Sequence, residues 1–151
     1  YYPSLPFELA EMDASTGEQG RSVLVIDDNA SMGELVQMLL GRARNDVVRY
    51  ANSGPKGLAA AKQNPPDLII LDIMMPGWDG FETYRQIRMA SNLETVPVLF
   101  QTAYARAYQM AQAVGAAGCL IAPYGEDELV AARDAALRGE EYGPSPEGEV
   151  Q

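Results

Sequence analysis

The chain has no histidine and a single cysteine among its 151 residues. Without histidine it holds neither a Ser-His hydrolytic pair nor a histidine metal ligand, and it cannot donate a phosphoryl group from phosphohistidine. The one cysteine, Cys119, excludes an intrachain disulfide and favours a reducing compartment, which predicts a cytoplasmic protein. No apolar run reaches the roughly 18 residues that a membrane-spanning helix needs, so we expect no membrane span.

Most of the net charge of −10 is carried by the two ends of the chain. Residues 1–20 and residues 139–151 each contain four acids and no Lys or Arg, and both are rich in Pro, Gly and Ser. Such segments bury too little apolar surface to offset their ordering entropy. We therefore predict a flexible acidic N-terminal extension (1–20), one domain (21–138), a flexible acidic C-terminal tail (139–151) and no nucleic-acid surface. The alternative is that apolar residues of the first segment dock as a helical turn.

Between the ends, short apolar runs alternate five times with segments of helical periodicity. The runs predict strands at residues 23–27, 47–51, 68–71, 96–100 and 119–121, and helices begin near residues 30, 53, 81, 107 and 126. Arg49 lies inside the second run and favours an edge strand there. Because the other runs are apolar throughout, they need burial on both faces, which right-handed crossovers provide. The pattern predicts a doubly wound, three-layer α/β domain with a parallel sheet.

Three acids close two of these apolar runs: Asp27 and Asp28 follow the first, and Asp72 follows the third. Ligands of an open α/β sheet bind beyond the carboxyl ends of its strands, so neighbouring first and third strands would bring the acids together. Three carboxylates at close range favour a divalent cation such as Mg²⁺. The alternative is that Asp27 and Asp28 only cap the helix that follows.

These acids lie within longer motifs. The motifs are Val-Leu-Val-Ile-Asp-Asp-Asn at 23–29, Leu-Ile-Ile-Leu-Asp-Ile-Met-Met-Pro-Gly-Trp-Asp-Gly at 68–80, Thr-Ala at 102–103 and Gly-Ala-Ala-Gly-Cys-Leu-Ile-Ala-Pro at 115–123. Together, over about residues 21–138, the chain resembles the response-regulator receiver domain of the chemotaxis-regulator type. The resemblance implies a flavodoxin-like sheet of strand order 2-1-3-4-5.

The resemblance also implies a role for each matching residue. Asp72 would accept a phosphoryl group from a histidine kinase or phosphotransfer protein. Mg²⁺ would be bound by Asp28, Asp72 and the backbone carbonyl of Met74, with Asp27 acting mostly through a bound water, and Thr102 would contact the phosphoryl oxygens. An output partner or a second copy would bind the fourth helix, fifth strand and fifth helix. The chain would not be an enzyme beyond phosphorylating and dephosphorylating itself at Asp72.

Two positions depart from the family pattern. Ala122 stands where the family has a lysine, and Cys119 stands where it usually has an aromatic switch residue. Two unit charges about 4 Å apart interact by roughly 4 kcal/mol at an effective dielectric near 20, so loss of the cation predicts a stronger dependence on Mg²⁺. Tyr104 and Arg106 are candidates to replace the aromatic and the cation, although a surface tyrosine and a solvated arginine are the commoner interpretations.

Two other functions compete with a phosphoryl-accepting switch. The missing lysine and aromatic favour a phosphorylation-independent pseudo-receiver that acts through protein interaction or dimerisation. A phosphatase with an aspartate nucleophile would need a second acid two residues after it, and Asp72-Ile73-Met74 lacks one. The sequence therefore favours the phosphoryl-accepting receiver over both.

Overall fold

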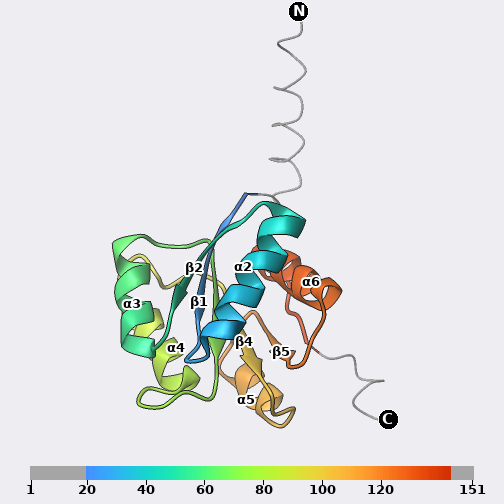
Figure 1. Ribbon diagram of the computed structural model, residues 1–151. Helices are drawn as coiled ribbons and strands as arrows, with labels where there is room; N and C mark the ends of the chain where they lie inside the picture. Colours follow the sequence, from blue (N-terminus) through green and yellow to red (C-terminus); the bar gives the residue numbers. More distant parts are fainter. Residues whose placement is uncertain (1–19, 144–151) are drawn as a thin grey trace, which may run out of the picture.

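The computed structural model describes residues 20–143, so most of the predicted acidic extensions, 1–20 and 139–151, lie outside the described residues. Five strands alternate with five helices (Figure 1). The elements in chain order are β1 (Ser22–Ile26), α2 (Ala30–Arg44), β2 (Val47–Ala51), α3 (Gly54–Gln63), β3 (Leu68–Asp72), α4 (Gly80–Met89), β4 (Val98–Thr102), α5 (Ala107–Ala113), β5 (Gly118–Ile121) and α6 (Glu126–Leu137). The predicted alternation is confirmed.

The strands form one parallel sheet in the order β2-β1-β3-β4-β5. This is the flavodoxin-like order that the resemblance implied. β2 is an edge strand, as we predicted from the charged Arg49 within it. The Arg49 guanidinium donates hydrogen bonds to the carbonyls of Ala60 and Asn64 at the C-terminal end of α3. β1 lies between β2 and β3, so the ends of β1 and β3 are neighbours.

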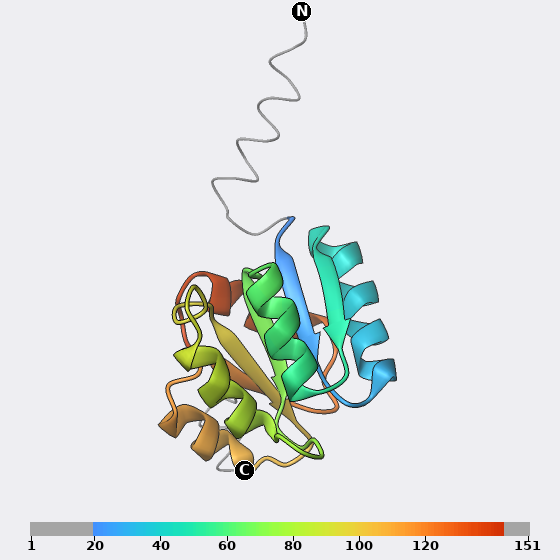
Figure 2. The same ribbon diagram turned by 90° about the vertical axis from the view of Figure 1, so that its left-hand side faces the viewer.

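Alternate side chains of the strands enter two separate cores, one on each face of the sheet. Leu24, Ile26 and Phe100 pack beneath α3, α4 and α5, and Figure 2 shows α3 and α4 lying over this face. Val25 and Ile70 pack on the opposite face against α2 and α6. Burial on both faces explains why these strands are apolar along their length.

The fourth strand begins two residues later than predicted, at Val98 rather than at residue 96. The Val96 N–H donates to the Leu93 carbonyl (3.3 Å), which keeps residue 96 in the preceding turn. Pro97 has no N–H to donate and contributes only its carbonyl, which accepts from the Ile69 N–H (3.0 Å). The shift makes Thr102 the last residue of β4, at the carboxyl edge of the sheet.

A buried ion-pair network fixes α6 to the loop between α2 and β2. Arg133 is fully buried, and its guanidinium donates to both carboxylate oxygens of Asp46 at 2.6 and 2.8 Å and to Asp134 at 2.8 Å. Arg44 of α2 donates two hydrogen bonds to the same Asp134. These pairs lower the pKa of Asp134 against the opposing effect of burial. The charges of the network are therefore compensated inside the fold.

The chain continues in contact with the sheet past α6. Tyr142 forms a parallel bridge with Gly118, donates its N–H to the Ala117 carbonyl and accepts the Cys119 N–H, both at 3.0 Å. The first residues of the segment predicted as a tail thus line the outer edge of β5. No helix among residues 20–143 has the length and apolar character needed to cross a bilayer.

The Arg133 network gives a stability prediction. Arg133→Leu leaves the Asp46 carboxylate buried without its cation, so we expect the free energy of unfolding to fall by about 3 kcal/mol or more, measured by urea denaturation. Arg85→Ala removes the exposed pair with Glu82 and should cost less than about 1 kcal/mol. A loss for Arg133→Leu no larger than that of the control would contradict the assignment.

Candidate functional site at the carboxyl edge of the sheet

Asp27, Asp28 and Asp72 meet at the carboxyl edge of the sheet. One carboxylate oxygen from each lies within 4.8 Å of the others. Ile26 and Leu71, the residues just before Asp27 and Asp72, are directly paired between β1 and β3, which explains the approach. Asp27 is buried, Asp28 is exposed and Asp72 is partly buried. We call these three residues the acid pocket.

Neither Asp27 nor Asp28 caps the helix that follows them. The N-cap of α2 is Asn29, whose side chain accepts a hydrogen bond from the Ser31 N–H (3.0 Å). Asp27 instead accepts the Asn29 N–H through Oδ1 at 2.8 Å. The capping alternative is therefore wrong, and both aspartate carboxylates remain in the acid pocket.

The loop after β3 is held tightly against Asp72. The Gly80 N–H donates to the Ile73 carbonyl (2.8 Å), and a Cβ at Gly80 would lie 2.5 Å from the Asp72 carbonyl oxygen. Only glycine permits this approach of α4 to the end of β3. The Met74 N–H donates to Asp72 Oδ1 at 3.3 Å, while the Met74 side chain is 57% exposed. The backbone of Met74 therefore adjoins the acid pocket and its side chain points away.

Electrostatics in the acid pocket favour protonation. Burial, followed by the charge of Asp27, raises the pKa of Asp72 to about 7. Burial also raises the pKa of Asp27, although hydrogen bonds from Asn29 and Gln101 act in the opposite direction. Within residues 20–143, none of the ion pairs formed by Arg includes a member of the acid pocket. A divalent cation would relieve this repulsion, and the oxygen donors fit Mg²⁺.

Thr102 and Ala122 lie side by side at the ends of β4 and β5. The Ala122 N–H donates to the Thr102 carbonyl at 2.7 Å, and Thr102 Oγ1 accepts the Tyr104 N–H at 3.1 Å. Ala122 lines an apolar hollow of about 290 Å³ with Pro123, Tyr124 and residues of α2. Ala122, where the resemblance led us to expect a lysine, thus forms part of an apolar wall.

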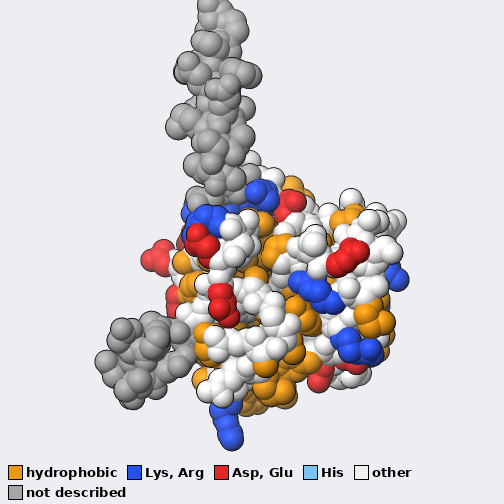
Figure 3. Space-filling view, turned by 180° about the vertical axis from the view of Figure 1, so that it is seen from behind, with side chains coloured by type: hydrophobic (Ala, Val, Ile, Leu, Met, Phe, Trp, Pro, Cys, Tyr) orange, Lys and Arg blue, Asp and Glu red, His pale blue; other side chains and the backbone are white. Residues whose placement is uncertain are grey.

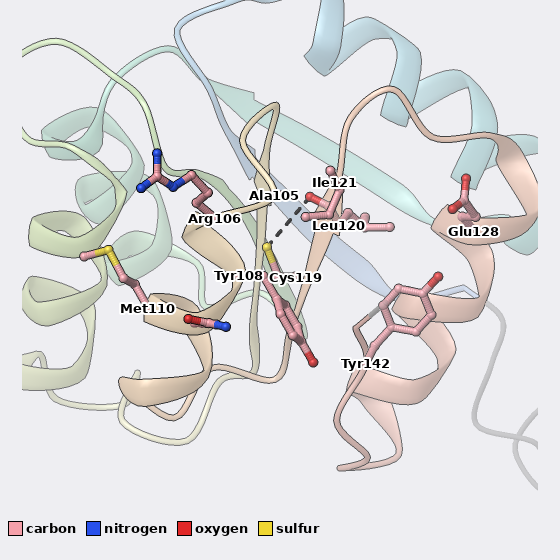
Figure 4. Close-up of a pocket in the computed structure, with 10 residues that line it drawn as sticks. Ala105, Arg106, Tyr108, Met110, Cys119, Leu120, Ile121, Glu128 and Tyr142 are labelled. Atoms are coloured by element: carbon pink, nitrogen blue, oxygen red, sulfur yellow. Dashed lines mark hydrogen bonds between the residues drawn. The ribbon is translucent and has the colours of Figure 1, made fainter. Parts of the chain in front are cut away.

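The two substitutes that the sequence suggested both point into solvent. Tyr104 is 58% exposed, and Arg106 is also exposed. Arg106 lines a different hollow, between α5 and β5 (Figure 4). Cys119 lies in the same region as a buried residue, and burial raises the pKa of its thiol to about 11. Cys119 is therefore a small apolar residue here rather than a reactive thiol.

Three polar residues around Asp27 were missed by the sequence interpretation. Gln101 Nε2 donates to Asp27 Oδ2 (2.7 Å), the Tyr124 hydroxyl donates to Gln101 Oε1, and the Tyr50 hydroxyl donates to the Asp27 carbonyl (2.7 Å). Gln101 carried the one available signal, because a polar side chain within a buried strand needs a partner. Tyr50 and Tyr124 gave no signal in a single sequence.

The comparisons with known proteins agree with the fold and identify its family. The response regulator receiver domain profile matches residues 23–134. The transcriptional regulatory protein YrkP of Bacillus subtilis is 39% identical over 118 residues, which cover 77% of this chain and 49% of YrkP. The DNA-binding regulator RpaA of Synechocystis is 37% identical, with 77% of this chain and 48% of RpaA covered. The chain spans about half the length of the curated relatives it matches.

Solved structures give the same result. The chemotaxis protein CheY4 of Vibrio cholerae superposes with a TM-score of 0.71 at 32% identity, covering 78% of this chain and 98% of CheY4. A putative response regulator from Chloroflexus aurantiacus gives 0.74 at 29% identity, covering 80% and 99% of the two chains.

The fold and the acid pocket together define a doubly wound α/β module with an acidic site at the carboxyl edge of its sheet. Within that class, the chain belongs to the response regulator receiver domain family. It is a receiver module of two-component signalling, a family in which aspartate phosphorylation and Mg²⁺ binding are general features. Receiver domains are in general signalling modules rather than enzymes.

The raised pKa of Asp72 predicts how stability depends on pH without Mg²⁺. Between about pH 4 and pH 7 Asp72 is protonated to a greater extent in the folded chain than in the unfolded chain, so its contribution to stability falls as pH rises. We expect a loss of roughly 1–2 kcal/mol across this interval, since solvent screens a partly exposed group. Urea denaturation in chelator at several pH values measures it.

Two variants isolate this effect. Asp72→Asn should flatten the pH dependence and stabilise the metal-free protein near pH 7. Glu94→Gln, at an exposed loop position, should retain the wild-type slope. Equal slopes for wild type and Asp72→Asn would show that Asp72 does not titrate in this interval.

Proposed function

We propose that Asp72 accepts a phosphoryl group from the phosphohistidine of a histidine kinase or phosphotransfer protein, with Mg²⁺ held in the acid pocket. The observation that carries the proposal is the gathering of three carboxylate oxygens within 4.8 Å at the ends of adjacent strands. Asp28, Asp72 and the Met74 carbonyl would bind the metal, and Asp27 would act mostly through water. The chain lacks histidine, so the phosphoryl donor lies outside these 151 residues or is a small phosphodonor.

Asp72 is a better nucleophile than Asp27, and the resemblance assigns Asp28 to the metal. Asp27 is buried with both oxygens hydrogen-bonded, whereas Asp72 is partly exposed and lies beneath an exposed loop residue, Met74. In the transfer, an ionised Asp72 oxygen forms the new P–O bond while the P–N bond of the donor breaks, and the departing imidazole takes up a proton. Bound Mg²⁺ supplies charge neutralisation on the transferred oxygens. Reactions of the chain alone would be limited to self-phosphorylation from a small donor and autodephosphorylation.

Thr102 would act after transfer. Its Oγ1 accepts the Tyr104 N–H, which leaves the hydroxyl proton available to donate to a phosphoryl oxygen. Since Thr102 is buried at the end of β4, such a bond would pull on the loop that leads into α5. Added charge of about −1.5 to −2 would reorder that loop.

We assign the partner surface to α5, β5 and α6, the fourth helix, fifth strand and fifth helix of the described domain. A hollow of about 1010 Å³ lies there, lined by Tyr108, Met110, Ile121, Glu128 and Tyr142 among others (Figure 4). Met110 and Val114 are exposed apolar residues, and Figure 3 shows hydrophobic side chains gathered low on the molecule, where α5 lies in Figure 1. An output partner or a second copy would bury them.

One observation favours a second function. Ala122 supplies no cation, and Cys119 provides neither the volume nor the hydroxyl of an aromatic switch residue. A pseudo-receiver would keep the fold and act through the partner surface without phosphorylation. Its acid pocket would then be a remnant of the family pattern.

Intact mass spectrometry separates the two functions. Within minutes of mixing with Mg²⁺ and acetyl phosphate, we expect wild type to gain the mass of one phosphoryl group, because the donor needs only a nucleophile and a neutralised pocket. Asp72→Asn should gain none, and omission of Mg²⁺ should abolish the adduct.

An acid at the other end of the same strand provides a matched control. Asp67→Asn alters an acid at the opposite end of β3 and should leave the adduct intact. An adduct on Asp72→Asn equal to that on wild type would place the modification elsewhere. No adduct on wild type, with acetyl phosphate or with phosphorylated kinase, would favour the pseudo-receiver.

A further inference from the structure

A chain of hydrogen bonds from two uncharged side chains ends on Asp27. The Tyr124 hydroxyl donates to Gln101 Oε1, and Gln101 Nε2 donates to Asp27 Oδ2 at 2.7 Å. Gln101 and Asp27 are 2% and 4% exposed, so water is largely excluded from their bond. We call Tyr124 and Gln101 the relay.

The direction of the relay follows from the chemistry of its members. An ionised carboxylate only accepts hydrogen bonds, so the NH₂ group of Gln101 must face Asp27. The amide oxygen of Gln101 then faces Tyr124, and the phenol can bond to it only as a donor. Both hydrogen bonds of the relay therefore donate in the direction of Asp27, and each bond in such a chain polarises the next.

The relay holds the second oxygen, Oδ2, of the Asp27 carboxylate. Oδ1 is already held by the Asn29 N–H at 2.8 Å, and Gln101 holds Oδ2. With both oxygens bonded, the carboxylate has one orientation relative to Asp28 and Asp72. Without Gln101, Oδ2 would lose its donor in a buried site, and that carboxylate could rotate.

Tyr124 lies close in sequence to Ala122, the position where the family pattern has a lysine. Tyr124 comes two residues after Ala122, and both line the same apolar hollow. Its hydroxyl thus reaches Gln101 from the same loop that carries Ala122, and burial raises the pKa of the phenol, which keeps it neutral. The loop supplies a hydrogen-bond donor instead of a charge.

We propose that Gln101 and Tyr124 are positioning residues that orient Asp27 for a divalent cation and thereby replace the missing lysine with uncharged donors. The inference rests on the proposed function, since it concerns Mg²⁺ binding in the same pocket. A neutral relay adds no competing positive charge, so the metal is the main cation of the site. Mutation of groups that orient metal-binding residues commonly weakens affinity by about 10- to 100-fold.

The test is the Mg²⁺ affinity of the full chain, measured by isothermal titration calorimetry. Tyr124→Phe removes only the hydroxyl, and we expect affinity to fall by about 3- to 10-fold, because it acts through Gln101. Gln101→Met keeps the length of the side chain and should weaken binding by about 10-fold or more. Tyr104→Phe removes a hydroxyl from an exposed tyrosine outside the relay and should bind like wild type.

A double variant distinguishes a relay from two independent packing effects. In the Gln101→Met background, Tyr124→Phe should cause no further loss of Mg²⁺ affinity, since the connection to Asp27 is already broken. A structural role alone would lower the melting temperature of the metal-free protein without changing affinity. The proposal is overturned if Tyr124→Phe binds Mg²⁺ like Tyr104→Phe, or weakens binding equally in both backgrounds.

Failure of the relay and failure of the proposed function give different results. If wild type binds Mg²⁺ and the relay variants bind equally well, only the relay is refuted. If wild type shows no Mg²⁺ binding at all, the metal-dependent function is refuted and the relay with it.

Discussion

The structure depends on one electrostatic constraint, the approach of three carboxylates within 4.8 Å without an arginine ion-paired to them in the described part of the chain. The parallel sheet imposes this approach, because β1 and β3 are neighbours and both end in aspartate. Burial makes the repulsion stronger. The pKa of Asp72 in the metal-free site is therefore about 7, close to neutral pH. A bound cation would reduce the repulsion among the three carboxylates.

The surrounding fold keeps the acids together in spite of this repulsion. Backbone N–H groups of Asn29 and Met74 bond to Asp27 and Asp72, and Gly80 allows α4 to close over the end of β3. The hydrophobic cores on both faces fix the register of the strands, and the Arg133 network secures α6, whose preceding loop carries Ala122 and Tyr124. Interactions elsewhere in the domain thus offset the repulsion among the three acids.

Sequence reasoning predicted the parallel sheet and the residues of the acid pocket, because apolar strand length and strand-end acids are local patterns. It placed β4 too early, since Val96 looks like a strand residue and only its bond to Leu93 shows that the turn continues. It considered Tyr104 and Arg106 as substitutes and missed Gln101 and Tyr124, because distance along the chain does not show which side chains turn toward Asp27.

The central claim is that this receiver site binds a cation and a phosphoryl group with uncharged donors in place of the lysine. The most direct test is a crystal structure of the full chain with Mg²⁺ and beryllofluoride, a mimic of the phosphoryl group. The account predicts beryllofluoride on Asp72, Mg²⁺ on Asp28, Asp72 and the Met74 carbonyl, and Asp27 still bonded to Gln101. An acid pocket without either ligand at saturating concentrations, or Asp27 turned away from Gln101 in the complex, would contradict it.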